Sequence, residues 1–319
     1  MTRRPRVLVT GASGFIGRFV ALALIDDGRF QPVVAGRNRP AGLDQNAYEF
    51  FQVGDLNADT DWGEGLEDVD AVLHLAGIAH VKDPSESTVA AFQQVNVDGT
   101  LQLAQQALGA GVRHFIFMSS IGVNGNANLR PFSSENTPSP KEAYAKSKLH
   151  AEFGLKSLCA AAPMAYTIVR PPLVYGPGAP GNFGLLSTIV SKEMPLPLSG
   201  IPNRRSFVSV WNLADLLVHC LLREESRGKT FVVRDGQDVS TSTFLKMIGE
   251  ASGHKVRLIR VPHPVLKLGA TLLGKRGMYD KLFDSLQVDD TDTRQVLGWQ
   301  PPYTLQESLR MCFQNDSSV

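Results

Sequence analysis

The sequence contains little cysteine, and its opposite charges nearly cancel. Only three of its 319 residues are cysteine, at Cys159, Cys220 and Cys312, and no CxxC pair occurs. This usage excludes a disulfide framework and indicates a reducing compartment. Lys and Arg number 32 against 31 Asp and Glu, a balance that argues against a dedicated nucleic-acid binder. We therefore expect a cytoplasmic protein with no nucleic-acid partner.

Long apolar runs and metal-binding spacings are also missing. No apolar run reaches the roughly 18 residues that a membrane-spanning helix needs, so we expect no membrane span. The opening MTRRPRVLVTGASGF has only a short apolar run before its glycines, which is typical of a first strand rather than a secretory signal. The seven histidines show no HxH, HxxxH or HExxH spacing, which argues against a metal site.

What is present, as far as Arg170, is an alternation of apolar strand-like and helix-like segments. The predicted strands are 7–10, 32–35, 50–53, 71–75, 114–118 and 166–169. The predicted helices are 15–25, 95–110 and 144–160. Continuous apolar strands that alternate with helices indicate an α/β fold with a doubly wound, Rossmann-like parallel sheet, covered on both faces.

The pattern changes after Arg170, because many Pro and Gly residues follow. We expect residues 1–175 to form a dinucleotide-binding domain, rejoined by a strand at 207–210 and a helix at 213–222 within about 206–235. Residues 176–205 and 236–319 would form a smaller substrate-binding region. In that region the apolar stretch 263–274 predicts a helix packed on the body, with a lid or an interaction surface as the alternative.

Gly11, Gly14 and Gly17 stand between the first predicted strand and the first predicted helix, in the segment GASGFIG. Glycine at these positions permits a tight turn, close approach of a pyrophosphate, and close packing of the helix on the strand. The pyrophosphate would meet the positive end of the helix. An ordinary strand-to-helix turn is the alternative, and the strand and helix on either side favour a dinucleotide site.

The second predicted strand is followed by Arg37. Enzymes that use NAD usually have an acid here, which binds the ribose 2′-hydroxyl, whereas an arginine suits a 2′-phosphate. Arg37 therefore favours NADP(H), with Arg39 as a weaker second signal. The alternative is a surface Arg37 stacked on adenine in an enzyme that uses either cofactor, so NAD(H) is also possible.

Tyr144 and Lys148 are four residues apart, on one face of the predicted helix 144–160. A free tyrosine has a pKa of about 10, too high for a base at neutral pH. A nearby ammonium and an oxidised nicotinamide would lower the pKa of Tyr144. Tyr144 would then exchange a proton with a substrate oxygen that Ser120 holds.

These segments resemble the extended short-chain dehydrogenases/reductases, in the NAD-dependent epimerase/dehydratase family, over almost the whole chain. The resemblance is carried by the segments GASGFIG, FIFMSSIGVNG, YAKSK, VRPPLVYGPG, RSFVSV and LGWQP. It implies that Ser120, Tyr144 and Lys148 are catalytic. For Asn96 we favour a structural role in its helix, and Asp55 and Ala76 are equally compatible with plain loop residues.

The resemblance also implies the ligand contacts. The cofactor-binding residues would be Gly11, Ser13, Gly14, Phe15, Ile16, Gly17, Arg37, Asp55, Leu56, Leu75, Ala76, Gly77, Asn96, Tyr144, Lys148 and Pro171. The substrate-binding residues would be Ser120, Asn182 and Arg205, with Arg205 on a diphosphate or, alternatively, on the surface. Family members commonly form homodimers through helices that correspond to 95–110 and 144–160.

The residues after Ser120 bear on the reaction. Family dehydratases carry an acid pair where this chain has Ile121 and Gly122, so a 4,6-dehydratase is disfavoured. The combination of Arg37 with SSIGVNG and RPPLVYGPG resembles bacterial UDP-sugar 4-ketoreductases of the UDP-N-acetylquinovosamine dehydrogenase type. This implies reduction of UDP-2-acetamido-2,6-dideoxy-4-ketohexose to UDP-N-acetylquinovosamine, for surface polysaccharide such as O-antigen. The alternatives are a UDP-hexose 4-epimerase with bound NAD and, more distantly, a non-catalytic NADP-binding sensor.

Overall fold

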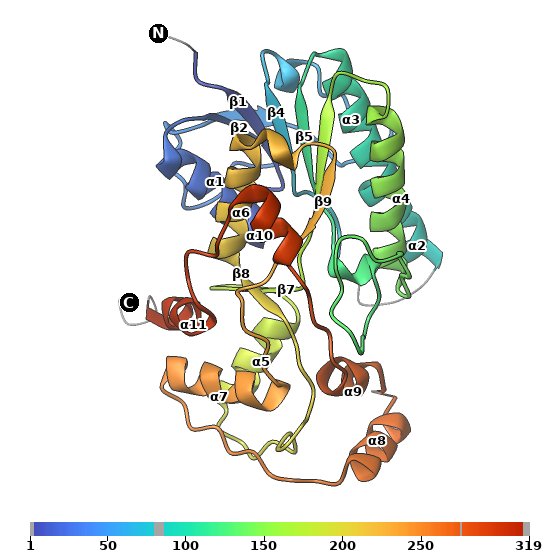
Figure 1. The fold of residues 1–319 in the computed structure, drawn as a ribbon. Coiled ribbons are helices and arrows are strands. Elements are labelled where there is room, and N and C mark those ends of the chain that lie inside the picture. The colour runs from blue at the N-terminus through green and yellow to red at the C-terminus, as the bar shows by residue number, and fades with distance from the viewer. Residues whose placement is uncertain (1–2, 80–85, 275, 315–319) are drawn as a thin grey trace.

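Seven parallel strands form the central sheet of the computed structural model, which describes residues 3–79, 86–274 and 276–314 (Figure 1). The strand order is β3-β2-β1-β4-β5-β6-β9. The strands are β1 (Arg6–Thr10), β2 (Gln31–Gly36), β3 (Glu49–Gln52), β4 (Ala71–His74), β5 (His114–Met118), β6 (Ala165–Arg170) and β9 (Lys229–Val232). The order reverses between β1 and β4, which is where doubly wound sheets bind ligands. The predicted fold class is confirmed.

Both faces of this sheet are buried, as the continuous apolar strands predict. In β1, Val7 and Val9 point into one core and Leu8 into the other, because successive side chains of a strand alternate between faces. Helices α1 (Phe15–Asp27) and α6 (Val210–Leu222) pack together on the first face, and α3 (Gly99–Gly109) and α4 (Ala143–Cys159) cover the second (Figure 1).

The segment predicted as the helix 95–110 has a more complex path. The chain forms α2 (Glu86–Phe92), then a π-helical turn at Gln93–Asp98, and then α3. Such π-helical turns are frequent at functional sites because they re-aim side chains. Asn96 lies in this turn and is fully buried.

The predicted strand 207–210 packs its Val208 into the core of the main sheet, but it is not one of the strands of that sheet. It forms β8 (Phe207–Ser209), which pairs only with β7 (Leu173–Tyr175) in a separate parallel sheet among the described residues. Ser209 ends the strand because its hydroxyl accepts a hydrogen bond from the Asn212 backbone N–H, which caps α6. The strand that returns to the main sheet in this part of the chain is β9.

The two-stranded sheet and three helices build a second core below the main sheet (Figure 1). The stacked rings of Phe207 and Phe244, 3.9 Å between centroids, lie in this core. The remaining helices are α5 (Asn182–Ser191), α7 (Thr241–Ser252), α8 (His263–Leu272), α9 (Arg276–Phe283), α10 (Thr291–Leu297) and α11 (Leu305–Gln314), of which α5, α7 and α11 contribute to this core. Within the described ranges, no helix has both the length and the hydropathy to cross a bilayer.

Candidate active site

Two cavities lie at the carboxyl ends of the central strands. The larger has a volume of about 1140 Å³ and the smaller about 410 Å³. They share Gly11, Gly14, Leu75, Gly77 and Ile78 in their walls, so they form adjoining parts of one site. This is the crevice that the reversal of strand order predicts.

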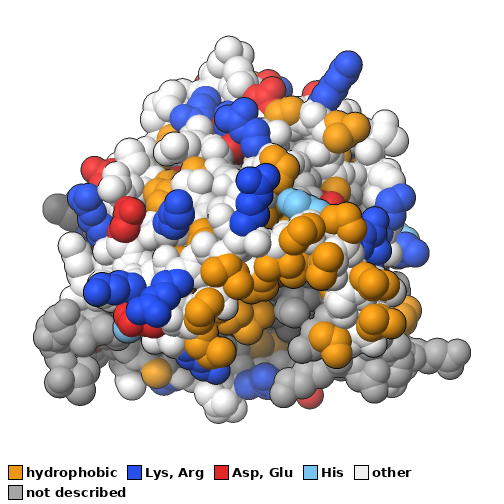
Figure 2. All heavy atoms as spheres, turned by 90° about the horizontal axis from the view of Figure 1, so that it is seen from below, with side chains coloured by type: hydrophobic (Ala, Val, Ile, Leu, Met, Phe, Trp, Pro, Cys, Tyr) orange, Lys and Arg blue, Asp and Glu red, His pale blue; other side chains and the backbone are white. Residues whose placement is uncertain are grey.

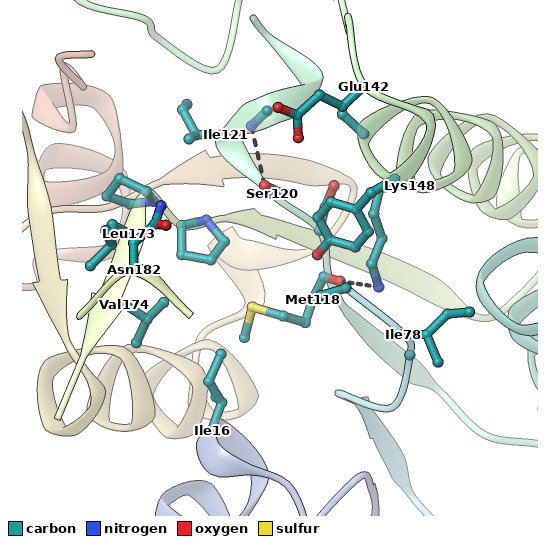
Figure 3. Close-up of a pocket in the computed structure, with 18 of the residues that line it drawn as sticks. Ile16, Ile78, Met118, Ser120, Ile121, Glu142, Lys148, Leu173, Val174 and Asn182 are labelled. Carbon is teal, nitrogen blue, oxygen red and sulfur yellow. Dashed lines mark hydrogen bonds between the residues drawn. The ribbon is translucent and has the colours of Figure 1, made fainter. Parts of the chain in front are cut away.

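All of the predicted contact residues except Asn96 line one of these cavities. The larger cavity is lined by the predicted residues Gly11, Gly14, Phe15, Ile16, Gly17, Leu75, Gly77, Ser120, Tyr144, Lys148, Pro171, Asn182 and Arg205. The smaller cavity adds Ser13, Arg37, Asp55, Leu56 and Ala76. Figure 3 shows Ser120, Lys148 and Asn182 around the larger cavity.

The turn between β1 and α1 has space only for glycine at two positions. Gly11 has φ +76°, and a Cβ there would lie 2.7 Å from the Ala76 nitrogen. A Cβ on Gly17 would lie 2.1 Å from the carbonyl oxygen of Gly11. No side chain caps the start of α1 at Gly14, so backbone N–H groups of its first turn face the cavities. This cradle fits the pyrophosphate of a dinucleotide.

Arg37 follows β2 and forms an ion pair with Asp55, 3.2 Å between Nη1 and Oδ1. Both side chains line the smaller cavity. Arg39 instead places its guanidinium 4.8 Å from the centroid of the Phe50 ring. Among the described residues of this cavity wall, Arg37 is therefore an exposed cation whose existing partner is a solvent-exposed carboxylate.

His74 connects β1 to the loop after β4, a role that sequence reasoning missed. Its Nδ1 lies 2.8 Å from Thr10 Oγ1 and its Nε2 lies 2.9 Å from Thr100 Oγ1. Thr10 Oγ1 also accepts hydrogen bonds from the N–H groups of Leu75 and Ala76. Burial, with a smaller effect of Lys148, lowers the pKa of His74 to about 3, so the ring is neutral. A polar residue in an otherwise apolar strand was the available signal.

Asn96 holds the same loop in place through its side-chain amide. Its Oδ1 accepts from the Ile78 N–H at 2.9 Å, and its Nδ2 donates to the Ile78 carbonyl at 2.9 Å. The same Nδ2 donates to Ser147 Oγ at 3.0 Å, which ties the loop to α4. Asn96 does not line either cavity, and these contacts match the structural role that we favoured for it.

Ser120, Tyr144 and Lys148 reach the larger cavity from two elements. Ser120 lies two residues after the end of β5, next to Ser119, and its Oγ accepts from the Gly122 N–H at 3.2 Å. Lys148, on α4 with Tyr144, donates from Nζ to the carbonyl oxygen of Met118 at 2.9 Å (Figure 3). Ser119 directs its hydroxyl to the buried Glu152 carboxylate, which leaves the Ser120 hydroxyl as the one available to a ligand.

Burial shifts the pKa values of both Tyr144 and Lys148. It raises the pKa of Tyr144 to about 12, whereas the Lys148 ammonium together with an oxidised nicotinamide was expected to lower it. The physical reason is that the phenol is desolvated while Lys148 is directed to the Met118 carbonyl. Burial lowers the pKa of Lys148 to about 8, against an opposing effect of the Glu152 carboxylate. At neutral pH Tyr144 therefore holds its proton and Lys148 is largely charged.

A buried network behind α4 was also missed. Arg170 donates from Nε to Glu152 Oε1 at 2.9 Å, and the two side chains are only 3% and 1% exposed. Arg170 also donates from Nη1 to Asn124 Oδ1 at 3.0 Å. Asn124 belongs to this network and does not line either cavity.

Arg205 and Lys281, from the later part of the chain, also line the larger cavity. Arg205 donates from Nη1 to the Asp284 carbonyl at 2.9 Å, and burial lowers the pKa of its guanidinium. Lys281 forms an ion pair with Glu142, 3.0 Å between Nζ and Oε1, across to the start of α4. Glu142 is the only carboxylate among the described residues that line this cavity. The described residues contain no group of three or more His, Cys, Asp or Glu that could hold a metal ion.

The comparison with known families agrees with this arrangement. The model of the NAD dependent epimerase/dehydratase family matches residues 7–233. The chain belongs to this family. It is therefore an enzyme of an NAD-dependent family.

Individual relatives extend the likeness over the whole chain. The UDP-glucose 4-epimerase of Vibrio cholerae is 39% identical over 97% of this chain and 94% of its own length. The N-acetyl-α-D-glucosaminyl-diphospho-ditrans,octacis-undecaprenol 4-epimerase of Escherichia coli O157:H7 is 27% identical over 95% of this chain and 92% of its own length. The solved UDP-N-acetylglucosamine 4-epimerase of Bacillus cereus has a TM-score of 0.79 at 18% identity, covering 98% of this chain and all of that chain, which shows the shared fold.

Proposed function

We propose that the protein catalyses hydride transfer from NADPH to C4 of a UDP-sugar that carries a ketone at this carbon. The substrate would be UDP-2-acetamido-2,6-dideoxy-4-ketohexose and the product UDP-N-acetylquinovosamine. The observation that carries this proposal is that Tyr144, Ser120 and Lys148 line one cavity together with the glycine turn. A phenol that keeps its proton at neutral pH is suited to donate it to a ketone oxygen.

The residues of the site then have separate tasks. NADPH, when bound, supplies the hydride to the carbonyl carbon. Ser120 donates a hydrogen bond to the ketone oxygen and orients it. Tyr144 donates its proton to that oxygen as negative charge develops there, and the Lys148 cation stabilises the phenolate that remains.

Cofactor binding would divide between the two cavities. The backbone N–H groups at the start of α1 would hold the pyrophosphate, in a turn whose close backbone packing admits only glycine at Gly11 and Gly17. Arg37 would bind the ribose 2′-phosphate, because a guanidinium is well suited to phosphate oxygens. Leu56, Leu75 and the other predicted lining residues would contact the adenosine and nicotinamide halves.

The UDP-sugar would extend into the second region, which we propose comprises residues 176–205 and 236–319. Arg205 is desolvated and lines the larger cavity, so its guanidinium would bind the diphosphate. Asn182, at the start of α5, would bind a polar group of the sugar or phosphate. With Ile121 and Gly122 on the wall, the cavity has no acid pair next to Ser120 for removal of a hydroxyl.

A second candidate is a UDP-hexose 4-epimerase, which is favoured by the 39% identity to the Vibrio cholerae relative of that name. An epimerase would use the same three residues. It would keep its cofactor bound and return the hydride to the opposite face of the 4-keto sugar. Arg37 argues for NADPH and therefore for the reductase.

The test is to incubate the protein with NADPH and the UDP-4-keto sugar and to follow the loss of nicotinamide absorbance, with NADH in parallel. We expect one NADPH to be consumed for each sugar reduced, faster than NADH. Tyr144→Phe should lower kcat by about 10²–10⁴-fold, while Tyr303→Phe, on a partly exposed ring outside both cavities, should leave it unchanged. Interconversion of UDP-glucose and UDP-galactose without NADPH consumption would contradict the reductase proposal and support the epimerase.

A further inference from the structure

Helix α8 presents an apolar face that lies outside every core cluster of the described residues. The sequence predicts a packed helix here, but none of its residues is buried and none belongs to a described core cluster. Val265, Leu268 and Leu272 are 58%, 61% and 78% exposed, and their spacing places them on one face. Leu273 follows at 73% exposure. Figure 2 shows hydrophobic side chains gathered around a hollow on this end of the molecule.

The segment around this helix is strongly cationic. Residues 251–279 contain no Asp or Glu, but they contain Lys255, Arg257, Arg260, Lys267, Lys275 and Arg276. The first four of these side chains are exposed. The whole chain has a net charge of only +1, so the remainder of the protein is net negative. The exposed apolar helix and an acid-free stretch of cations therefore coincide in one segment.

This combination distinguishes between possible occupants of the face. A twofold contact between two copies would bring the same cations together, and their repulsion disfavours a second copy. Anionic lipid headgroups complement the cations, and the apolar face of an amphipathic helix enters the boundary between headgroups and acyl chains. We infer that residues 255–273 dock the protein on an anionic lipid bilayer, with α8 lying in the plane of the surface.

The docking helix lies close to the proposed active site. The His263 ring of α8 contacts the Phe283 ring of α9 edge to face, 5.0 Å between centroids. Helix α9 also carries Lys281, which lines the larger cavity and pairs with Glu142. Helix α9 thus contacts α8 and also contributes to the cavity wall. Docking through α8 would therefore hold the cavity near the bilayer.

The experiment is co-sedimentation of the full-length protein with vesicles of phosphatidylcholine, alone or mixed with phosphatidylglycerol. We expect binding that increases with phosphatidylglycerol content and weakens as salt is added, because salt screens exposed charges. The double variant Leu268→Ser/Leu272→Ser should lower the partition coefficient by about tenfold or more. The triple variant Arg257→Gln/Arg260→Gln/Lys267→Gln should remove the dependence on phosphatidylglycerol.

The matched controls are Leu129→Ser and Arg130→Gln, which change exposed residues on a loop outside this segment and should leave vesicle binding unchanged. Sizing of wild type and the Leu268/Leu272 variant tests the alternative of a second copy. Absence of binding to the mixed vesicles would overturn the inference, as would equal binding to pure phosphatidylcholine. A dimer that the Leu268/Leu272 variant converts to monomer, without vesicle binding, would also overturn it and assign the face to self-association.

Discussion

Lys148 donates a hydrogen bond from its buried Nζ to the carbonyl oxygen of Met118, 2.9 Å away at the end of β5. This contact ties α4, which carries Tyr144, to the strand that leads into Ser120. An ammonium has three donors, so Lys148 is able to keep this bond and still bind a ribose hydroxyl or stabilise a phenolate. The geometry of the proposed site therefore depends on a charged lysine held against a backbone carbonyl.

The pH dependence of reduction follows from this lysine. Burial lowers the pKa of Lys148 to about 8, whereas the pKa of Tyr144 is raised to about 12. The Lys148 cation is present below its pKa and is lost above it, so kcat/KM for ketone reduction should be level below pH 8 and fall above it. Measurement of kcat/KM between pH 6 and pH 10 checks this, over a range in which Tyr144 stays protonated.

Two substitutions identify the titrating group. Lys148→Arg keeps a cation that does not titrate in this range, so the alkaline fall should disappear in the activity that remains. Lys146→Met, at an exposed lysine on the same helix, should leave the pH profile of kcat/KM as in wild type. An alkaline fall that persists unchanged in Lys148→Arg would assign it to another group.

The buried Glu152–Arg170 pair should dominate local stability. Glu152→Gln leaves the Arg170 guanidinium buried without a carboxylate, which costs about 3–5 kcal/mol of unfolding free energy. Urea denaturation measures this cost. The surface pair of Glu224 with Arg227 provides the comparison, and Glu224→Gln should cost less than about 1 kcal/mol. Similar losses of unfolding free energy in the two variants would mean that the buried pair contributes no more to stability than the surface pair.

Loss of the Glu152 carboxylate should also be visible in the pH profile. The carboxylate favours the charged form of Lys148, so its removal lowers the pKa of that lysine further. The alkaline fall in kcat/KM should therefore begin at a lower pH in Glu152→Gln than in wild type. An unchanged profile in a folded Glu152→Gln variant would show that the two groups do not interact.

Cofactor choice should depend on Arg37. Arg37→Ser removes a charge-assisted contact to the 2′-phosphate, so KM for NADPH should rise about tenfold to a hundredfold, with little change for NADH. Steady-state kinetics with both cofactors measure this ratio. Arg29→Ser, at the opposite end of β2, where Arg29 pairs with Asp27, is the control. An unchanged NADPH/NADH preference in Arg37→Ser would refute the proposed role.

The glycine turn should tolerate no Cβ at its third glycine. In Gly17→Ala the new atom would lie 2.1 Å from the Gly11 carbonyl oxygen, so α1 must move away from β1. We expect a stability loss of about 1–3 kcal/mol and at least about tenfold weaker NADPH binding. Gly109→Ala, where a Cβ meets nothing within 4 Å, should change stability by less than about 1 kcal/mol. Thermal unfolding and a fluorescence titration with NADPH test both variants.

Much of the central sheet was predictable, because its strands are buried on both faces. The apolar runs at Val7–Thr10 and His114–Met118 mark β1 and β5 to within a residue. The glycine turn was predictable for a different reason: close packing of α1 on β1 excludes every other residue at Gly17. In both cases a short stretch of sequence carries the signal, because the burial of a strand or the packing of a turn restricts which residues fit there.

The remaining features depend on contacts between distant parts of the chain. The strand Phe207–Ser209 was assigned to the main body, but an apolar strand of this length does not indicate its partner, which is β7. The pair of Glu142 with Lys281 joins two regions that only the folded chain brings together. The apolar spacing of α8 predicts a helix correctly, but it cannot indicate whether the protein itself covers that face.

The most direct test of the proposed hydride transfer is to supply NADPH with deuterium at the transferable position of its nicotinamide. The UDP-4-keto sugar serves as substrate, and the product is analysed by mass spectrometry and NMR. We predict one deuterium at C4 of the product for each NADPH oxidised, and formation of this product at least about a hundredfold more slowly with Tyr144→Phe. A product formed by the wild-type protein with no deuterium at C4 would contradict the account.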